Sequence, residues 1–66
     1  MESNLRESRE REGLSQGDLG EAVGVTRQTI NAIERGRYDP SLELALKLAA
    51  HFDCPVEDLF HLEESP

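Results

Sequence analysis

Three glycines divide this sequence into short helical segments at regular intervals. Each follows a stretch with helical apolar spacing, at a position where a left-handed C-terminal cap favours glycine: Gly13, Gly24 and Gly36. A hydroxyl residue that can accept hydrogen bonds from free N–H groups comes soon after each one: Ser15, Thr26 and Ser41. This pattern predicts helices over residues 3–12, 16–23, 27–35 and 42–52, and a fifth from Val56 to about Leu62.

Apolar residues recur within these segments at helical spacing. One stripe expected to face the core runs through the fourth segment: Leu42, Ala45, Ala49 and Phe52. No stretch alternates with a period of two for long enough to predict a strand. The sequence therefore predicts a single all-α domain over residues 1–66, with residues 1–2 and 63–66 loose at its ends.

Cysteine content and apolar run length limit where the chain can work. The single cysteine, Cys54, allows no intrachain disulfide and fits a reducing compartment, so we expect a cytoplasmic protein. The first seven residues are charged where a signal peptide would be apolar. The longest nearly apolar run, residues 44–50, is far too short to cross a bilayer, so we expect no membrane partner.

The sequence contains no grouping of residues that is typical of a catalytic or cofactor-binding site. No grouping of serine, histidine and carboxylate predicts a nucleophile, and no phosphate-binding glycine loop is present. His51, Cys54 and His61 match no tight zinc spacing. We therefore expect no enzyme activity, no small-molecule substrate, no cofactor and no metal.

The distribution of charge is more informative than its sum. Fourteen acidic residues against seven basic ones give a formal charge of −7, which by itself argues against nucleic acid as a partner. Residues 26–38, however, hold Arg27, Arg35 and Arg37 against one acid, Glu34, for which Arg6 or Arg9 is a possible structural partner. High acid content with a single lysine fits a protein of concentrated salt, and equally an acidic surface that keeps a small protein soluble.

Residues 16–35 form the most informative segment, two short helices joined by the turn Gly24-Val25-Thr26. Gly20 falls where the helices cross, and a small residue there allows close approach. Ile30 and Ile33 lie on one side of the second helix, opposite a polar set: Arg27, Gln28, Asn31 and Arg35. Arginine can bond guanine through two hydrogen bonds, and asparagine or glutamine can bond adenine in the same way. The segment therefore predicts a helix-turn-helix that presents its second helix to DNA.

Three stretches resemble the Cro/phage-repressor type of helix-turn-helix domain, also called the xenobiotic-response-element type: residues 13–16, 24–30 and 33–41. The resemblance extends from about Leu5 to Phe60 and implies a five-helix, lambda-repressor-like domain that binds operators, commonly as a dimer. It implies base contacts by Arg27, Gln28 and Asn31, and apolar contact at most by Ala32. It also implies phosphate contacts by a second set: Gln16, Thr26, Arg35, Arg37 and Tyr38.

The second predicted helix departs from this family pattern in its glycines. Gly20 stands where the family usually has alanine, and Gly17 adds another glycine to the same helix. Each is expected to cost roughly 0.5–1 kcal/mol relative to alanine.

Surplus leucines in the second half predict a partner surface. Leu44 and Leu48 lie four residues apart beside the core stripe, and we expect them to form a homodimer interface with Leu62. The alternative is that Leu48 completes the core and Leu44 is merely exposed.

The function predicted is a sequence-specific DNA-binding transcriptional regulator that works as a homodimer on a palindromic operator. A protein-interaction module, such as an antitoxin or a regulator of another factor, is the alternative favoured by the acidic second half and the spare leucines.

Overall fold

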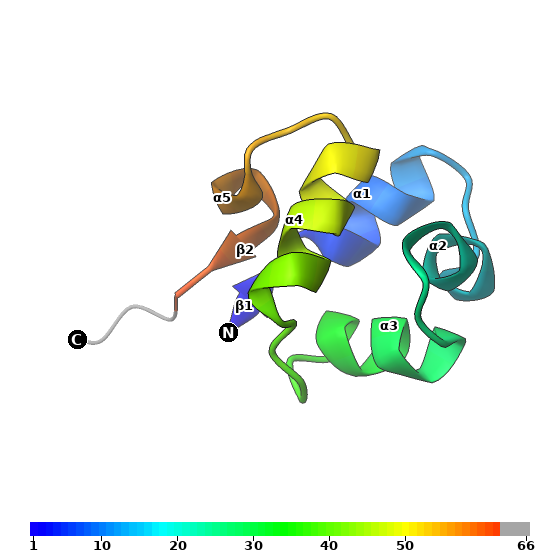
Figure 1. The fold of residues 1–66 in the computed structure, drawn as a ribbon, viewed down its shortest axis with the longest axis horizontal. Helices are drawn as coiled ribbons and strands as arrows, with labels where there is room; N and C mark the ends of the chain where they lie inside the picture. Colours follow the sequence, from blue (N-terminus) through cyan, green and yellow to red (C-terminus); the bar gives the residue numbers. More distant parts are fainter. Residues whose placement is uncertain (63–66) are drawn as a thin grey trace.

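The computed structural model describes residues 1–62, which form five helices (Figure 1). These helices surround one apolar core. The helices are α1 (Leu5–Arg11), α2 (Gln16–Val23), α3 (Arg27–Glu34), α4 (Leu42–His51) and α5 (Val56–Leu59). Two short strands, β1 (Glu2–Ser3) and β2 (Phe60–His61), pair antiparallel. The predicted five-helix fold is thus confirmed, and the predicted loose tail, residues 63–66, lies outside the described residues. No helix within residues 1–62 has the length and apolar character needed to span a bilayer.

Hydroxyl caps begin the three middle helices where the sequence predicts them. Ser15 Oγ accepts from the Asp18 N–H (2.9 Å), and Asp18 Oδ2 accepts from the Ser15 N–H (3.2 Å), so this capping box is complete. Thr26 Oγ1 accepts from the Thr29 N–H at 3.2 Å, and Ser41 caps α4 in the same way. These bonds satisfy backbone donors that a helix start leaves free.

The two ends of the chain differ from the prediction. Ser3 pairs with Phe60 in the ribbon of β1 and β2, so residues 2–3 are neither helical nor loose. The Asn4 N–H donates to the Leu59 carbonyl at 2.8 Å, and α1 starts only at Leu5. On the other side α5 stops at Leu59, because Phe60 turns to an extended conformation (φ −128°, ψ 136°). Strands of two residues are too short to leave a period-two pattern in the sequence.

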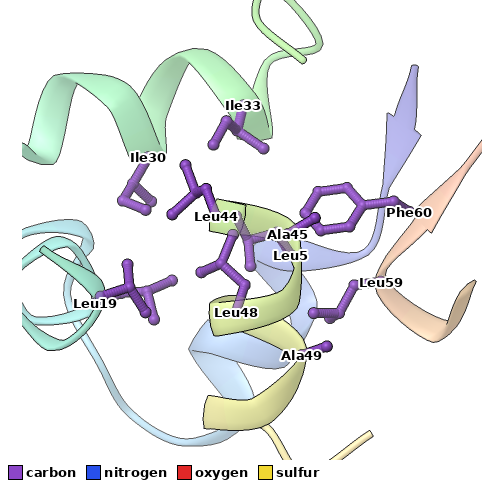
Figure 2. Packing of buried hydrophobic residues seen from close by; sticks show 11 residues of the cluster. Leu5, Leu19, Ile30, Ile33, Leu44, Ala45, Leu48, Ala49, Leu59 and Phe60 are labelled. Atoms are coloured by element: carbon purple, nitrogen blue, oxygen red, sulfur yellow. The ribbon is translucent and has the colours of Figure 1, made fainter. Parts of the chain in front are cut away.

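The buried face of α4 is wider than the predicted stripe (Figure 2). Leu48 is fully buried and Leu44 is 7% exposed, so the prediction that these two supply an exposed dimer surface is wrong. The physical reason is that α4 packs against α2 on one side and α5 on the other, which turns both stripes inward. Leu42, predicted to be in the core, is 74% exposed because it begins α4 beyond the edge of this packing.

Candidate nucleic-acid interface

Helix α3 separates its apolar and polar residues cleanly. Ile30 and Ile33 are 0% and 2% exposed and point into the core, as Figure 2 shows. Arg27 and Gln28 are exposed on the other side of the helix, and Asn31 is half-buried. The two isoleucines thereby fix which face of α3 is turned to solvent. All three residues predicted to contact bases keep polar groups at the surface.

Four of the predicted DNA-contacting residues surround one shallow recess: Gln16, Arg27, Gln28 and Asn31. Arg35 lines an adjoining recess, which shares Gln16 and Asn31 as its boundary and also includes Arg6 and Arg9. The structure thus joins the start of α2 to the outer side of α3. Sequence reasoning had assigned no DNA contact to Arg6, because helical spacing alone does not show that α1 reaches this surface.

The remaining predicted phosphate contacts lie apart from these two recesses. Thr26 is exposed at the N-cap of α3, where its hydroxyl oxygen already serves the backbone of that helix. Arg37 is exposed in the loop after α3. Tyr38 is 48% exposed and borders a different hollow, between the Gly24 turn and α4. Tyr38 is therefore not brought together with Gln16 and Asn31.

Three arginines of the candidate interface have no acidic partner among the described residues. Within residues 1–62, Arg27, Arg35 and Arg37 form no ion pair. Three of the other four arginine and lysine side chains are paired: Arg6 with Glu10 at 3.3 Å, Arg9 with Glu34 at 2.7 Å and Lys47 with Glu43 at 3.0 Å. Although the net charge of the chain is −7, three guanidinium groups on and just beyond α3 are unpaired among residues 1–62.

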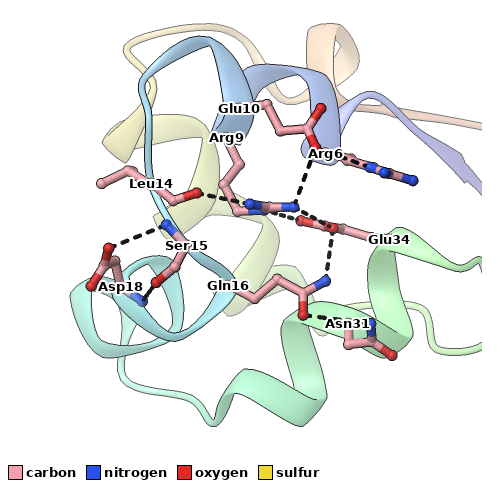
Figure 3. Close-up of polar contacts among 9 residues, drawn as sticks. All are labelled: Arg6, Arg9, Glu10, Leu14, Ser15, Gln16, Asp18, Asn31 and Glu34. Atoms are coloured by element: carbon pink, nitrogen blue, oxygen red, sulfur yellow. Dashed lines mark hydrogen bonds and ion pairs between the residues drawn. The ribbon is translucent and has the colours of Figure 1, made fainter.

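A partly buried ion pair joins α1 to the end of α3 (Figure 3). Arg9 Nε and one terminal nitrogen donate to the two carboxylate oxygens of Glu34, at 2.7 and 3.1 Å. Both side chains are largely buried, Arg9 at 11% and Glu34 at 3% exposure. The hydrogen bond to Glu34 raises the pKa of the Arg9 guanidinium further above its already high ordinary value. Of the two partners left open by the sequence, Arg9 holds Glu34, whereas Arg6 bonds Glu10.

Glu34 also reaches the candidate interface through two amide side chains. Gln16 Nε2 donates to Glu34 Oε1 at 3.0 Å, and Asn31 Nδ2 lies 3.5 Å from Gln16 Oε1. Sequence reasoning missed this connection, because no local spacing relates the first residue of α2 to the last residue of α3. Gln16 is therefore bonded directly to the partly buried Arg9–Glu34 pair, and Asn31 is connected to that pair through Gln16.

No cluster of three or more histidine, cysteine or acidic residues in the described part of the chain could hold a metal ion. The polar residues of the interface are arginines and amides, which donate hydrogen bonds or bind phosphate and base edges. This composition suits the recognition of nucleic acid.

Comparison with known proteins agrees with this geometry. A family model described as helix-turn-helix matches residues 5–59. An uncharacterised helix-turn-helix-type transcriptional regulator of Bacillus subtilis is 56% identical over 64 residues, which is 97% of each chain. The restriction-modification controller protein C.AhdI of Aeromonas hydrophila has a TM-score of 0.77 and 41% identity, covering 85% of each chain. The P22 c2 repressor, solved with a synthetic operator, has a TM-score of 0.77 and 30% identity over 80% of each chain.

These matches extend over nearly all the described residues and include the turn, its caps and the outward face of α3. Their names are those of transcription regulators and repressors rather than of a class of enzymes. The chain belongs to the helix-turn-helix family of transcriptional regulators, of the Cro/phage-repressor type.

Proposed function

We propose that this protein regulates transcription by placing α3 in the major groove of a specific DNA sequence. The observation that carries the proposal is the outward face of α3, where Arg27 and Gln28 project from a helix fixed by two buried isoleucines. A helix of this width fits the major groove, in which each base pair presents a distinct pattern of donors and acceptors. The operator present in the P22 c2 repressor structure supports the same mode of binding.

Contacts to the DNA backbone would position this helix in the groove. Arg35 and Arg37 carry charges unpaired within residues 1–62, and Arg6 lines the recess that Arg35 and Gln16 share. We assign phosphate contacts to them, and also to Thr26 at the start of α3 and to Tyr38. Such contacts fix the register on the duplex without reading its sequence.

Selection of bound sequences from a random DNA pool tests the proposal. We expect one preferred sequence, and alanine at Arg27 or Gln28 to cost about 1–3 kcal/mol of discrimination at the base pair that each contacts. Arg11→Ala is the matched control, because Arg11 is an exposed arginine that lines a different hollow with Phe52 and Cys54. The control should keep the parental preference. Parental preferences in both Arg27→Ala and Gln28→Ala would contradict the assigned readout.

We further propose that the protein binds a palindromic operator as a homodimer. Leu42 and Leu46 are 74% and 54% exposed and lie four residues apart on α4, and Leu62 is 81% exposed after β2. They take the place of the buried Leu44 and Leu48 as the apolar part of an interface. Beside them Glu43 and Lys47 carry opposite charges four residues apart. In an antiparallel, twofold pairing of α4 with its copy, Glu43 of each chain would face Lys47 of the other.

Sedimentation of the free protein at several concentrations tests the dimer. Replacing Leu46 with serine should weaken dimerisation about tenfold or more, because burial of one leucine contributes about 1.5–3 kcal/mol. Glu43→Lys or Lys47→Glu alone should also weaken the dimer, and the double exchange should restore it. Glu21→Ser on the exposed side of α2 is the control and should change nothing. Equal dimer affinity in all of these variants would refute the interface.

A further inference from the structure

Hydrogen bonds connect four side chains in series, from α1 to the outer side of α3: Arg9, Glu34, Gln16 and Asn31. The donor and the acceptor in each of these bonds follow from the bond before it. Both carboxylate oxygens of Glu34 accept hydrogen bonds from guanidinium nitrogens of Arg9. Whatever faces Glu34 from the other side must therefore donate. The group in that position is the Gln16 side chain, whose Nε2 lies 3.0 Å from Glu34 Oε1.

The orientation of the Gln16 amide in turn sets the orientation of the Asn31 amide. Because Gln16 turns its nitrogen towards Glu34, its oxygen Oε1 points to the outer part of α3 and needs a donor. Asn31 supplies that donor, with Nδ2 at 3.5 Å. If Asn31 were rotated by 180° about its last torsion, two amide oxygens would face each other and the bond would be lost. The Glu34 carboxylate thus favours one orientation of an amide two side chains away, because the other would place two oxygens 3.5 Å apart.

The orientation decides what Asn31 offers to the recess that it shares with Arg27 and Gln28. Figure 3 shows the oxygen of Asn31 pointing away from Gln16, while its nitrogen faces Gln16. One acceptor and one remaining N–H are therefore left for a ligand, in a fixed order. Adenine presents the matching pair in the major groove, a donor at N6 and an acceptor at N7.

We propose that Glu34, acting through Gln16, is a positioning residue that fixes the amide of Asn31 to read adenine. The inference rests on the proposed binding of α3 in the major groove. Glu34 touches no base itself and lies 3% exposed behind the interface. Its role is to remove one of the two orientations in which Asn31 could meet a base pair.

The experiment compares sequence preferences selected from a random DNA pool for the full chain and its variants. Asn31→Ala first identifies the operator position at which adenine preference depends on Asn31. Glu34→Gln then replaces one carboxylate oxygen with a donor, and Gln16→Met removes the intermediate amide while leaving the Arg9–Glu34 pair intact. We expect both to lower the preference for adenine at that single position by about fivefold or more. The preferences assigned to Arg27 and Gln28 should stay unchanged.

Glu12→Gln is the control, since the Glu12 carboxylate also lies near a basic side chain, His51 at 3.8 Å, but forms no hydrogen bond or ion pair with Arg9, Glu34, Gln16 or Asn31. It should retain the parental profile. If Glu34→Gln is unfolded by circular dichroism, Gln16→Met decides the question, because the ion pair is intact in that variant.

Three results would overturn the inference. The first is an unchanged adenine preference in folded Glu34→Gln and Gln16→Met. The second is an equal loss of affinity for all sequences, which indicates a purely structural role for Glu34. The third is an Asn31→Ala profile identical to the parent. A parent protein that selects no sequence at all would instead refute the proposed function itself, so the two failures are distinguishable.

Discussion

The thiol of Cys54 illustrates how the environment of a single residue sets its chemistry. Cys54 is half-buried against the core, in the segment between α4 and α5. Burial raises the pKa of the thiol, and the negative charges of Asp58 and Asp53 raise it further. Since the thiolate is the reactive form, Cys54 should be a poor nucleophile and a poor metal ligand at neutral pH.

This pKa shift predicts a pH dependence of reactivity. The rate at which Cys54 reacts with a disulfide reagent should rise with a midpoint above that of an unstructured cysteine. The free energy of unfolding depends on the same shift, because the pKa of the thiol is higher in the folded state than in the unfolded state. The stabilisation by the protonated thiol is complete below the pKa of the unfolded state and is lost as the pH rises through the pKa of the folded state. Urea unfolding at pH 7 and pH 10 measures this loss, and Cys54→Ala removes it. A reaction midpoint below that of the unstructured cysteine would contradict the prediction.

The outward residues of α3 could be predicted from the sequence, because a helical wheel sets Arg27 and Gln28 opposite Ile30 once the helix is located. The hydrogen bonds of Glu34 could not, since its partners come from two other helices and their approach depends on packing. The exposed fraction of each leucine on α4 could not be predicted from the sequence either. Leu44 and Leu42 are chemically identical and differ only in which neighbours surround α4.

The sequence predicts correctly the start of each helix that is set by neighbouring residues. It does not predict the strands, which depend on residues far away in the sequence. The starts of α2, α3 and α4 follow from hydroxyl caps that bond a backbone N–H three residues later. The ribbon of β1 and β2 has no such signal, because each strand forms only through its partner at the other end of the chain. Both helices next to the ribbon were consequently predicted too long.

Helix α2 contains two glycines that serve different purposes. An added Cβ at Gly20 would lie 2.7 Å from the Val25 carbonyl oxygen, so the absence of a side chain lets the turn pack directly on the helix. The Val25 N–H donates to the Gly20 carbonyl at 2.8 Å across the same contact. At Gly17 the nearest atom, Ser15 Oγ, would be 3.8 Å away, which is ordinary contact. Of these two glycines, only Gly20 makes a close backbone contact that a side chain would disturb.

Alanine substitutions at these two positions should therefore have different effects. Gly17→Ala should stabilise the protein by about 0.5–1 kcal/mol, because alanine loses less backbone entropy in a helix. Gly20→Ala gains the same helix propensity but must displace backbone of the turn, so we expect it to be less stable than Gly17→Ala. Thermal unfolding followed by circular dichroism measures both. Equal stabilisation at both positions would show that the turn yields without cost.

At the scale of the whole molecule, charge is segregated rather than balanced. Fourteen acidic residues outnumber seven basic ones, yet the arginines of α3 and its following loop have no acidic partner within residues 1–62. DNA approaching the interface therefore meets local positive charge on a body that repels it at longer range. Rising salt weakens both the short-range attraction and the long-range repulsion, and these two changes have opposite effects on the affinity for DNA.

The affinity for DNA should consequently fall with salt less steeply than the number of arginines suggests. Rising salt weakens phosphate contacts through counterion release, but it also screens the repulsion between the acidic body and DNA. Titrations of operator DNA over a range of salt concentrations give the slope. Arg37→Ala should lower affinity for all sequences and flatten the slope further. A slope equal to roughly six or more released ions for each proposed dimer would refute the expectation.

The pairing of Ser3 with Phe60 has a consequence for the order of folding. Its two strands are separated by nearly the entire described chain, whereas the contacts of α2 with α3 join neighbours in sequence. Closing so long a loop costs conformational entropy that only packed intervening helices can offset. The ribbon is therefore expected to close last and to open first, and the Asn4 amide, bonded to Leu59, should exchange its proton for deuterium sooner than the Val25 amide in the turn.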